Sequence, residues 1–266
     1  MISIIMGTYH GRDRIERSIT SIVQQTFKDW ELLICDDCSQ DGTFEFLKSK
    51  YQDCSNIKIF RLSKNSGLAT ALNECLKHAQ GEYIARMDDD DYAHPNRLQV
   101  QYEYIESHPE FAVVGTSINY IDNNGIYGEM IYPNKELTKQ DIFKGNCFVH
   151  PSVIMRKEAL NAVGGYTVSD ITIRGQDYDL WCKLYAHGYK GINLEDKLLD
   201  YFETRDSIKR RKFIHDINLY KNKIIWRKKL DLPIYYNYYA YRCVITGLLP
   251  QWLYSLLRRI KVTLSI

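Results

Sequence analysis

The sequence lacks any hydrophobic run long enough to cross a bilayer, and it lacks the features of a secreted protein. The longest uncharged run, Cys243–Leu257, is interrupted by Pro250 and falls short of the roughly 20 residues that a spanning helix needs. The apolar run Ile2–Met6 is too short for a signal peptide, and a polar stretch follows it. The 7 cysteines are irregularly spaced, as is typical of reduced thiols. We therefore expect a cytoplasmic protein without a disulfide framework.

A strong net charge, an internal repeat and a low-complexity linker are also absent from the sequence. Charged residues make up 26% of the chain, but the formal net charge is only +2, so bulk electrostatics identifies no partner. Basic residues crowd the last quarter, and acidic residues dominate the opening stretch. A chain of 266 residues is long enough for one large domain, or for a domain with an appendage.

Apolar runs alternate with helical patterns through the first hundred residues. Short apolar runs are typical of strands buried on both faces, and this alternation predicts right-handed βαβ units and a parallel, Rossmann-like sheet. Asp13 is the expected N-cap of the first helix, and Gly81 is the expected C′ residue of the third. The expected strands are Ile2–Met6, Glu31–Asp36, Ile57–Leu62 and Tyr83–Met87, and the expected helices are Ile15–Val23, Thr43–Ser49 and Leu68–Ala79.

The second half of the sequence mixes short strands with helices. A turn signal at Asp122–Gly125 separates two strands, so we expect antiparallel strands to continue the same sheet. The expected fold class is α/β, with a mostly parallel central sheet, helices on both faces and a C-terminal helical extension. The expected elements are strands at Ala112–Tyr120, Ile126–Ile131, Ser152–Arg156, Tyr189–Asn193 and Lys197–Phe202, a helix that ends at Gly164–Gly165, and a helix at Gln176–Ala186.

From residue 206 the pattern becomes helical, basic and rich in tyrosine. We expect one domain over residues 1–205 and an extension over residues 206–266. In the extension, Trp252 and several leucines share a helical face, with Arg258 and Arg259 nearby. Such a helix can lie on an anionic membrane surface. Packing on the preceding domain or on a second copy of the chain is the alternative.

Four consecutive aspartates, Asp88–Asp91, follow the apolar strand Tyr83–Met87. Like charges repel, and buried carboxylates need water or a counterion, so such a run at a buried strand end is costly. Ligands of open α/β sheets bind at the carboxyl ends of the strands. Because carboxylate oxygens suit Mg²⁺ or Mn²⁺, we interpret the run as a metal site. A solvated acidic turn is the alternative.

Several separate blocks of the sequence resemble the family 2 glycosyltransferases, which have a GT-A-type nucleotide-sugar fold. The resemblance covers roughly Ile2–Tyr201, with the blocks in order and at family-like spacing. It implies a nucleotide-sugar-binding half over about residues 1–100 and an acceptor-binding half over about residues 101–205. The blocks are SIIMGTYHGRDRIERSITSIVQQTF, ELLICDDCSQDGT, NSGLATALNECLKHAQGEYI with the acid run after it, HPSVIMR, VGGY and GQDYDLW.

The resemblance places the nucleotide of the donor at the ends of the first strands. Thr8 and Tyr9 follow the first strand, where a base can stack on the tyrosine ring, although an ordinary loop tyrosine fits as well. The resemblance places on Asp37 the acceptor of a hydrogen bond from the imide N–H of uracil. Capping of the next helix is the alternative for this acid. Lys64 and Asn65 lie in a loop that the resemblance puts near the donor.

The resemblance also assigns the acid run. Asp88 and Asp90 occupy the two acid positions of the DxD-type motif of the family. We expect Asp90 to contact Mn²⁺ or Mg²⁺, Asp88 or Asp89 to lie on the ribose side, and Asp91 to be the candidate for orienting the loop. A divalent ion held there neutralises the charge that develops on the departing diphosphate. Four acids in a row leave the register open by one residue.

Asp177 is the general base that the resemblance implies. Gln176 replaces the first acid of the pair usual in the family, which removes a negative charge and should make Asp177 a slightly weaker base. Asp179 competes for the role, and either acid could instead stabilise a helix N-terminus. His150, Gln176 and Asp179 are expected on the acceptor side, and Arg205 is a candidate to offset diphosphate charge.

The resemblance, together with these residues, implies an inverting, metal-dependent hexosyl- or N-acetylhexosaminyltransferase. The expected donor is a UDP-sugar, and the expected acceptor is a saccharide or lipid-linked saccharide in bacterial surface-polysaccharide assembly, with the enzyme peripheral on the inner face of the plasma membrane. A nucleotidyltransferase is one alternative, but the sequence Gly7–Arg12 is a poor match to a glycine-rich phosphate loop. A non-catalytic metal- or partner-binding module is another, although the acid run lacks the glycine and glutamate of an EF-hand loop. We expect no nucleic-acid partner.

Overall fold

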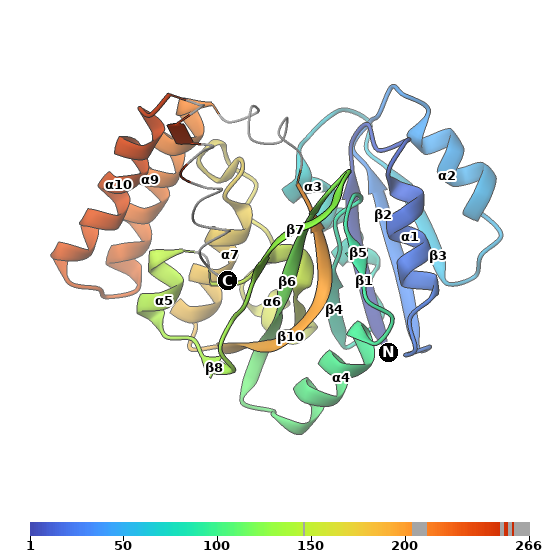
Figure 1. The fold of residues 1–266 in the computed structure, drawn as a ribbon, viewed down its shortest axis with the longest axis horizontal. Helices are drawn as coiled ribbons and strands as arrows, with labels where there is room; N and C mark the ends of the chain where they lie inside the picture. Colours follow the sequence, from blue (N-terminus) through green and yellow to red (C-terminus); the bar gives the residue numbers. More distant parts are fainter. Residues whose placement is uncertain (146, 204–211, 251–252, 255–256, 258–266) are drawn as a thin grey trace.

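The computed structural model describes residues 1–145, 147–203, 212–250, 253, 254 and 257 of the chain. A mixed sheet of ten strands forms the centre of the molecule, with helices on both of its faces (Figure 1). This arrangement confirms the predicted α/β class. The C-terminal helices are also present, at the end of the sheet farthest from the first three strands of the chain.

The first half of the sheet consists of parallel strands joined by helices. Its elements are β1 (Ile2–Thr8), α1 (Ile15–Val23), β2 (Trp30–Asp36), α2 (Thr43–Tyr51), β3 (Ile57–Arg61), α3 (Leu68–His78), β4 (Tyr83–Arg86), β5 (Tyr92–Ala93) and α4 (Arg97–Ser107). Every residue of β1, β2 and β4 is buried, as the continuous apolar runs predict. Because β1 pairs in parallel with both β2 and β4, the carboxyl ends of these three strands lie at one edge of the sheet.

The second half adds mainly antiparallel pairings. Its elements are β6 (Phe111–Asp122), β7 (Gly125–Met130), β8 (Lys135–Glu136), α5 (Lys139–Lys144), η1 (His150–Ser152), β9 (Ile154–Arg156), α6 (Lys157–Ala162), η2 (Asp170–Thr172), α7 (Gln176–Ala186) and β10 (Lys190–Phe202). The strand order is β3-β2-β1-β4-β9-β6-β10-β5, with β7 on β6 and β8 on β10. The antiparallel strand β9 lies between β4 and β6 and joins the two halves into one sheet.

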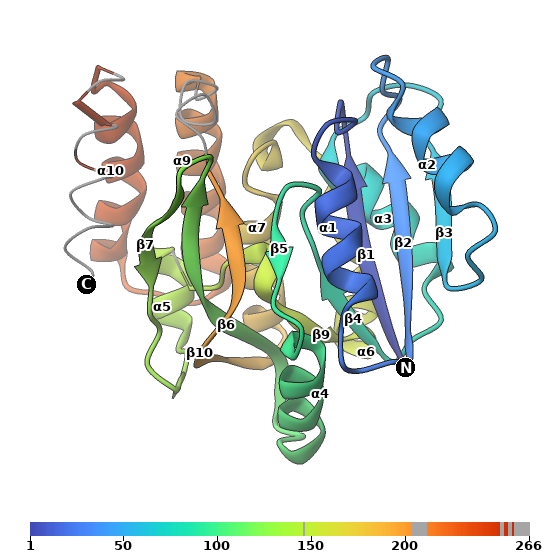
Figure 2. The same ribbon diagram turned by 45° about the vertical axis from the view of Figure 1, so that its right-hand side comes forward.

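Two hydrophobic clusters fill the space between the sheet and its helices. On one face, α1, α2 and α4 pack against β1, β2 and β6, and Figure 2 shows α1 and α2 in front of the sheet. On the other face, α3, α6 and α7 cover the sheet. Alternation along β1 serves both clusters, since Ile4 and Met6 belong to the first and Ile5 belongs to the second.

The C-terminal helices pack on the second of these faces. They are α9 (Phe213–Lys229), the short η3 (Ile234–Tyr236) and α10 (Asn237–Gly247). Trp226 and Leu230 belong to the same cluster as Tyr178 and Leu180 of α7, so α9 is part of the core of the molecule. The predicted residue Arg205 and the predicted tail residues Trp252, Arg258 and Arg259 lie outside the described residues. In the described part of the chain, no helix combines the length and the apolar character needed to cross a bilayer.

The structure corrects both predicted helix caps. Asp13 does not cap α1, because Arg14 occupies the N-cap position and no side chain closes that end. Gly81 is not the C′ residue of α3, because the helix already ends at His78 and the chain is extended at the next residue. Gly81 instead permits a close approach to β1, since a Cβ there would lie 2.6 Å from the backbone nitrogen of Ser3.

The structure also replaces two predicted strands by one. The segments Tyr189–Asn193 and Lys197–Phe202 both belong to β10, which continues through the polar residues between them. The register of β10 on β6 shifts between Leu194 and Lys197 and again before Leu199. The register shifts fall at the exposed, charged residues Glu195–Lys197, which lie inside β10. Because these residues interrupt the apolar pattern, the sequence predicted two strands where the structure has one.

Candidate active site

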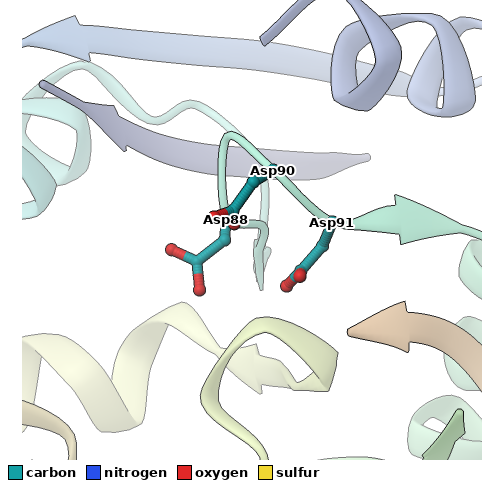
Figure 3. Close-up of side chains that lie close together, drawn as sticks. All are labelled: Asp88, Asp90 and Asp91. Carbon is teal, nitrogen blue, oxygen red and sulfur yellow. The ribbon is translucent and has the colours of Figure 1, made fainter. Parts of the chain in front are cut away.

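Three carboxylates of the acid run converge directly after β4. Ligand oxygens of Asp88, Asp90 and Asp91 lie within 4.8 Å of one another (Figure 3). Burial, followed by the charges of Asp88 and Asp89, raises the pKa of Asp90 to about 7. Burial and the same kind of repulsion raise the pKa of Asp91 well above its ordinary value. Clustered hard oxygen ligands that repel one another suit a divalent cation.

Asp91 supplies the sharpest indication that the cluster fits a cation. Its Oδ1 accepts a hydrogen bond from the backbone N–H of Phe202 at 2.8 Å, and its carbonyl oxygen accepts one from the Ser18 hydroxyl at 2.6 Å. Its Oδ2 is buried and has no hydrogen-bond partner among the described residues. A buried carboxylate oxygen left without a donor is costly, and a metal ion would remove that cost.

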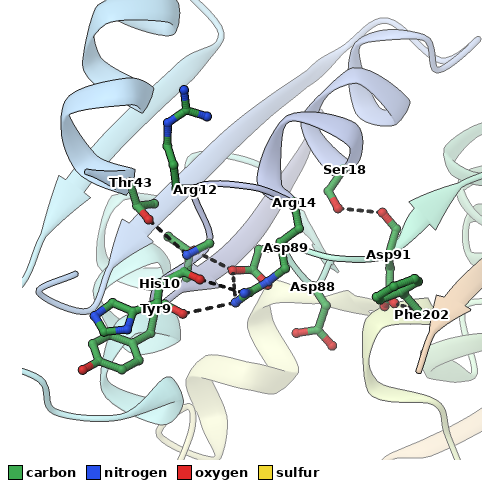
Figure 4. Close-up of polar contacts among 12 residues, drawn as sticks. Tyr9, His10, Arg12, Arg14, Ser18, Thr43, Asp88, Asp89, Asp91 and Phe202 are labelled. Atoms are coloured by element: carbon green, nitrogen blue, oxygen red, sulfur yellow. Dashed lines mark hydrogen bonds and ion pairs between the residues drawn. The ribbon is translucent and has the colours of Figure 1, made fainter. Parts of the chain in front are cut away.

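The Asp89 side chain points away from Asp88 and Asp91 and toward the loop between β1 and α1 (Figure 4). It accepts hydrogen bonds from the Thr8 hydroxyl at 2.5 Å and from Nε and Nη2 of Arg14, each at 3.0 Å. Burial by itself lowers the pKa of Arg14, and the neighbouring Asp89 carboxylate reverses this and raises the pKa above its ordinary value. Both oxygens of Asp89 are therefore engaged in holding this loop.

The same arginine also fixes the backbone that follows β1. Arg14 donates from Nη1 to the His10 carbonyl at 2.7 Å and from Nη2 to the Tyr9 carbonyl at 3.1 Å. The exposed Tyr9 ring stacks on the His10 ring with 4.0 Å between centroids. Gly11 is needed here, because a Cβ would lie 2.3 Å from the Thr8 hydroxyl. An exposed aromatic ring thus stands on a fixed loop at the carboxyl end of the sheet.

Asp37 holds a second loop at this edge. Its two oxygens accept hydrogen bonds from the backbone N–H groups of Ser66 at 2.6 Å and Gly67 at 2.8 Å. Burial raises the pKa of Asp37 above its ordinary value, against the lowering effect of these two donors. Lys64 and Asn65, on the same loop, are exposed to solvent. Asp88 and Asp89 aside, the residues predicted for the nucleotide lie at the carboxyl ends of neighbouring parallel strands: Thr8 is the last residue of β1, and Tyr9, Asp37, Lys64 and Asn65 lie in the loops that follow β1, β2 and β3.

A pocket of about 370 Å³ extends from Asp88, in the loop that carries the acid run Asp88–Asp91 (the acid loop), to the start of α7. Asp88 and Asp177 both line it, together with His150 and Gln176. Oδ1 of Asp177 accepts a hydrogen bond from the Tyr178 N–H at 2.8 Å, and burial raises the pKa of Asp177 above its ordinary value. The pocket is also lined by the aromatic residues Tyr120, Tyr132, Phe148 and Tyr201. Carboxylates from the two halves of the chain thus line the same pocket.

The other two residues proposed for the base and acceptor side have firm structural partners. His150 is buried, with Nε2 at 2.8 Å from the Tyr166 hydroxyl, and burial and Arg86 lower its pKa well below the ordinary value. Asp179 is absent from the pocket lining, and its Oδ1 accepts a hydrogen bond from Nε1 of Trp226 at 2.7 Å. The structure therefore brings Asp177, Gln176 and His150 to the pocket and leaves Asp179 behind it.

Arg86 is a pocket residue that the sequence reasoning missed. Its side chain is 1% exposed, pairs with Asp88 and lines the pocket, while Nε and Nη1 have no partner among the described residues. Burial opposes the charge of Arg86, but Asp88 outweighs this effect and raises the pKa. Arg86 could have been identified from the sequence, because it is a charged residue inside the otherwise apolar strand before the acid run. Arg86 places a fixed positive charge between the acid loop and the pocket.

A sheet with acids at the carboxyl ends of its parallel strands, and a further acid across one pocket, defines the GT-A class of glycosyltransferases. Solved structures agree on the fold: S. aureus TarS in complex with UDP-GlcNAc has a TM-score of 0.71 to this chain at 21% identity, over 93% of this chain and 71% of the other. The chain belongs to glycosyl transferase family 2, whose model matches residues 3–164.

Curated relatives support the same family. The chain is 37% identical to the putative glycosyltransferase EpsE of Bacillus subtilis, over 94% of this chain and 90% of that protein. It is 32% identical to the Escherichia coli UDP-Glc:alpha-D-GlcNAc-diphosphoundecaprenol beta-1,3-glucosyltransferase WfgD, over 80% of this chain and 81% of that protein. The resemblance read from the sequence blocks is thereby confirmed, and the chain is a glycosyltransferase.

Proposed function

We propose that this glycosyltransferase moves a sugar from a UDP-sugar to a hydroxyl of a saccharide or lipid-linked saccharide acceptor, with inversion at the anomeric carbon. One observation carries the proposal: Asp88 of the acid cluster and Asp177, which come from opposite halves of the chain, line the same pocket. Similarity to WfgD, whose name gives a UDP-sugar donor and a diphosphoundecaprenol-linked acceptor, supports a role in bacterial polysaccharide biosynthesis.

The donor's nucleotide fits the loops that follow β1, β2 and β3. The exposed Tyr9 ring offers a face for a base, and the loop at Lys64 and Asn65 offers exposed polar groups nearby. The carboxylate oxygens of Asp88, Asp90 and Asp91 are the ligand atoms that would hold Mn²⁺ or Mg²⁺. Such an ion supplies charge neutralisation for the departing diphosphate. Arg86 adds a fixed positive charge on the same side of the pocket.

Asp177 acts as the general base in this proposal. It takes the proton from the acceptor hydroxyl, whose oxygen then forms a bond to the anomeric carbon as the bond to the diphosphate breaks. Burial raises the pKa of Asp177, which makes its carboxylate a stronger base than an exposed one. Because only the ionised form accepts the proton, transfer should weaken as the pH falls through this raised pKa. The aromatic lining of the pocket suits the apolar face of a sugar ring.

The decisive experiment is a panel of nucleotide sugars assayed with Mn²⁺, with Mg²⁺ and with chelator, with free nucleoside diphosphate as the readout. We expect one UDP-sugar to be turned over with metal only. Release of pyrophosphate would instead indicate a nucleotidyltransferase, and binding of cation without any turnover would indicate a non-catalytic module.

Asp177→Asn tests the base, and Asp179→Asn is its matched control two residues away. We expect the first variant to lose about 10²–10⁴-fold in kcat with donor binding intact. The control should keep most activity, since asparagine retains an oxygen for the Trp226 N–H. Normal turnover by Asp177→Asn, or an equal loss in both variants, would contradict the assignment.

We also propose that the C-terminal extension associates with the inner face of the plasma membrane. The described part supports this with exposed tyrosines beside basic residues: Tyr235 is 71% and Tyr238 62% exposed. The full chain should sediment together with phosphatidylglycerol vesicles, and a chain that ends at Asp231 should stay in the supernatant. Full-length Tyr235→Ser/Tyr238→Ser should also bind less. Unchanged vesicle binding in both would refute the idea.

A further inference from the structure

Helix α9 contacts the segment around Asp177 from both sides. We propose that α9 positions Asp177 through Trp226 and Asn218, so that this C-terminal helix is a working part of the active site. The inference rests on the proposed role of Asp177 as the base. We use the name base loop for residues 169–179, which include η2 and the first turn of α7.

On the carboxyl side of Asp177, the contact is the hydrogen bond from the Trp226 indole to Asp179. The Nε1–Oδ1 distance is 2.7 Å, and both side chains are buried. The other oxygen of Asp179 has no hydrogen-bond partner among the described residues. A buried carboxylate with so few donors depends strongly on the one that it has. The indole N–H therefore fixes the first turn of α7, two residues from Asp177.

On the amino side of Asp177, α9 holds η2. Nδ2 of Asn218 donates to the carbonyl oxygen of Asp170 at 2.7 Å. Further along, Leu219 lies 4.0 Å from the position that a Cβ on Gly175 would take, so the helix also contacts the residue before α7. The base loop is thus anchored upstream of Asp177 as well as downstream.

Between these anchors lies a buried lysine. The Lys223 side chain is 3% exposed, with Nζ 4.2 Å from the centroid of the Tyr178 ring and 2.5 Å from the carbonyl oxygen of Phe143. An ammonium over an aromatic face is attractive, and burial strengthens the attraction. Tyr178, which follows Asp177 and donates its N–H to that side chain, is therefore held from the α9 side.

The α9 residues that contact the base loop lie on one face of the helix. Asn218, Asn222 and Trp226 follow one another at intervals of four residues, and Leu219 and Lys223 accompany them, so all lie on one helical face. Asn222 is buried on the same face. A shift of this face moves the segment that carries Asp177, and a displacement of about 1 Å at a reacting group can cost about 10²-fold in rate.

Trp226→Phe tests the proposal, because phenylalanine fills much of the indole volume and removes the N–H. Trp30→Phe is the matched control: Trp30 is also buried, but its Nε1 has no partner among the described residues, and it begins β2, which lies between β3 and β1 in the first half of the sheet. Amide hydrogen exchange and steady-state kinetics are measured on both full-length variants.

We expect Trp226→Phe to raise amide exchange in residues 169–179 about tenfold or more and to leave residues 83–93 unchanged. It should lower kcat about tenfold, keep the donor KM within about twofold, and move the acid limb of the pH–rate profile. Trp30→Phe should do none of this. Asp179→Asn in the Trp226→Phe background should restore part of the kcat, because it removes the unpaired buried charge.

Unchanged exchange in the base loop, exchange raised evenly along the chain, or an unchanged kcat and pH profile would each overturn the proposal. Failure of the proposed function looks different: the wild-type chain then transfers no sugar, while the exchange measurement still decides whether α9 holds the base loop.

Discussion

At the scale of single residues, four neighbouring aspartates have four different environments. Asp88 pairs with Arg86, Asp89 is held by Thr8 and Arg14, and Asp91 accepts a hydrogen bond from a backbone N–H. Burial first, and then the charges of Asp88 and Asp89, raise the pKa of Asp90 to about 7. The four aspartates therefore differ in their partners, which come from β1, the N-cap of α1, β4 and β10.

The Asp90→Asn variant tests this difference through stability. Because the pKa of Asp90 is raised from 3.8 to about 7, the folded chain holds the proton more tightly than the unfolded chain does. Stability of the metal-free protein should therefore fall as pH rises across that window. The stability of the variant should not show this decrease with pH. Above pH 7 the variant should have a higher melting temperature than wild type, by about 2–4 °C per kcal/mol of repulsion removed.

Thermal melts from pH 4 to 8, with chelator and with Mn²⁺, measure this effect. Mn²⁺ should raise the melting temperature of the wild type more than that of Asp90→Asn. Asp122→Asn, at the end of β6 and away from the acid run, serves as the control for the loss of one charge. A variant that melts lower than wild type in chelator at pH 8 would contradict the repulsion described for Asp90.

The locations of the candidate site residues were predictable from the sequence where acids stand at the ends of strands or helices, and their roles stay predictions. Asp88, Asp90 and Asp177 could be found because acids at strand and helix ends leave a pattern. The register of the acid run could not, because it depends on Asp89 turning toward Arg14. Arg86 and Trp226 were missed, because their partners are set by packing and leave no local pattern.

At the scale of elements, periodicity predicted the central helices and strands well. The strands β1, β2 and β4 are buried on both faces and read as continuous apolar runs. The helix Gln176–Ala186 has the bounds that its apolar spacing predicts. Predictions of the ends were weaker: the caps at Asp13 and Gly81 were wrong, since tertiary contacts decide where a helix stops.

Arg14 links two elements, and Arg14→Lys tests that link. Lysine keeps the charge but cannot donate two parallel hydrogen bonds to Asp89 while also reaching the carbonyls of Tyr9 and His10. We expect a loss of about 1–3 kcal/mol in unfolding free energy and weaker UDP binding, because the loop after β1 loses its anchor. Denaturant melts and calorimetric UDP titration measure both.

Arg12→Lys is the control for this variant, since Arg12 lies on the same loop with its guanidinium over the Phe46 ring. If Arg14→Lys bound UDP as wild type does, the loop after β1 would have no part in holding the nucleotide.

At the scale of the whole molecule, the two halves of the sheet and the C-terminal helices form one packed unit. The antiparallel strand β9 joins the halves, and α9 shares a hydrophobic cluster with α7. The sequence predicted a helical, basic extension and left packing on the preceding domain as an open alternative, because the buried face of α9 carries Asn218, Asn222 and Lys223 among its apolar residues. From the sequence alone, a helix face with polar residues is predicted to be exposed to solvent, because the partners that bury it are not visible in the pattern.

Two truncations test this unity. A chain that ends at residue 205 leaves Tyr178 and Phe143 without the α9 side chains that cover them, so we expect it to aggregate or to melt without cooperativity. A chain that ends at Asp231 keeps α9 and should melt cooperatively, with a lower midpoint because α10 is missing. Near-ultraviolet circular dichroism melts distinguish the two. Cooperative melting of the shorter chain at the wild-type temperature would show that α9 is dispensable for the fold.

The contacts of α9 also order events in time as the chain is synthesised. Trp226 is 47 residues after Asp179, and Asn218 is 48 residues after Asp170. At about 5–20 residues per second, a ribosome needs about 2–9 s to make that stretch after the base loop itself. During this interval the strands and the acid loop proposed to bind the nucleotide are already translated, while the residues proposed to position the base are not. On the roles proposed here, the nascent protein passes through a stage in which it can hold its donor before it can use it.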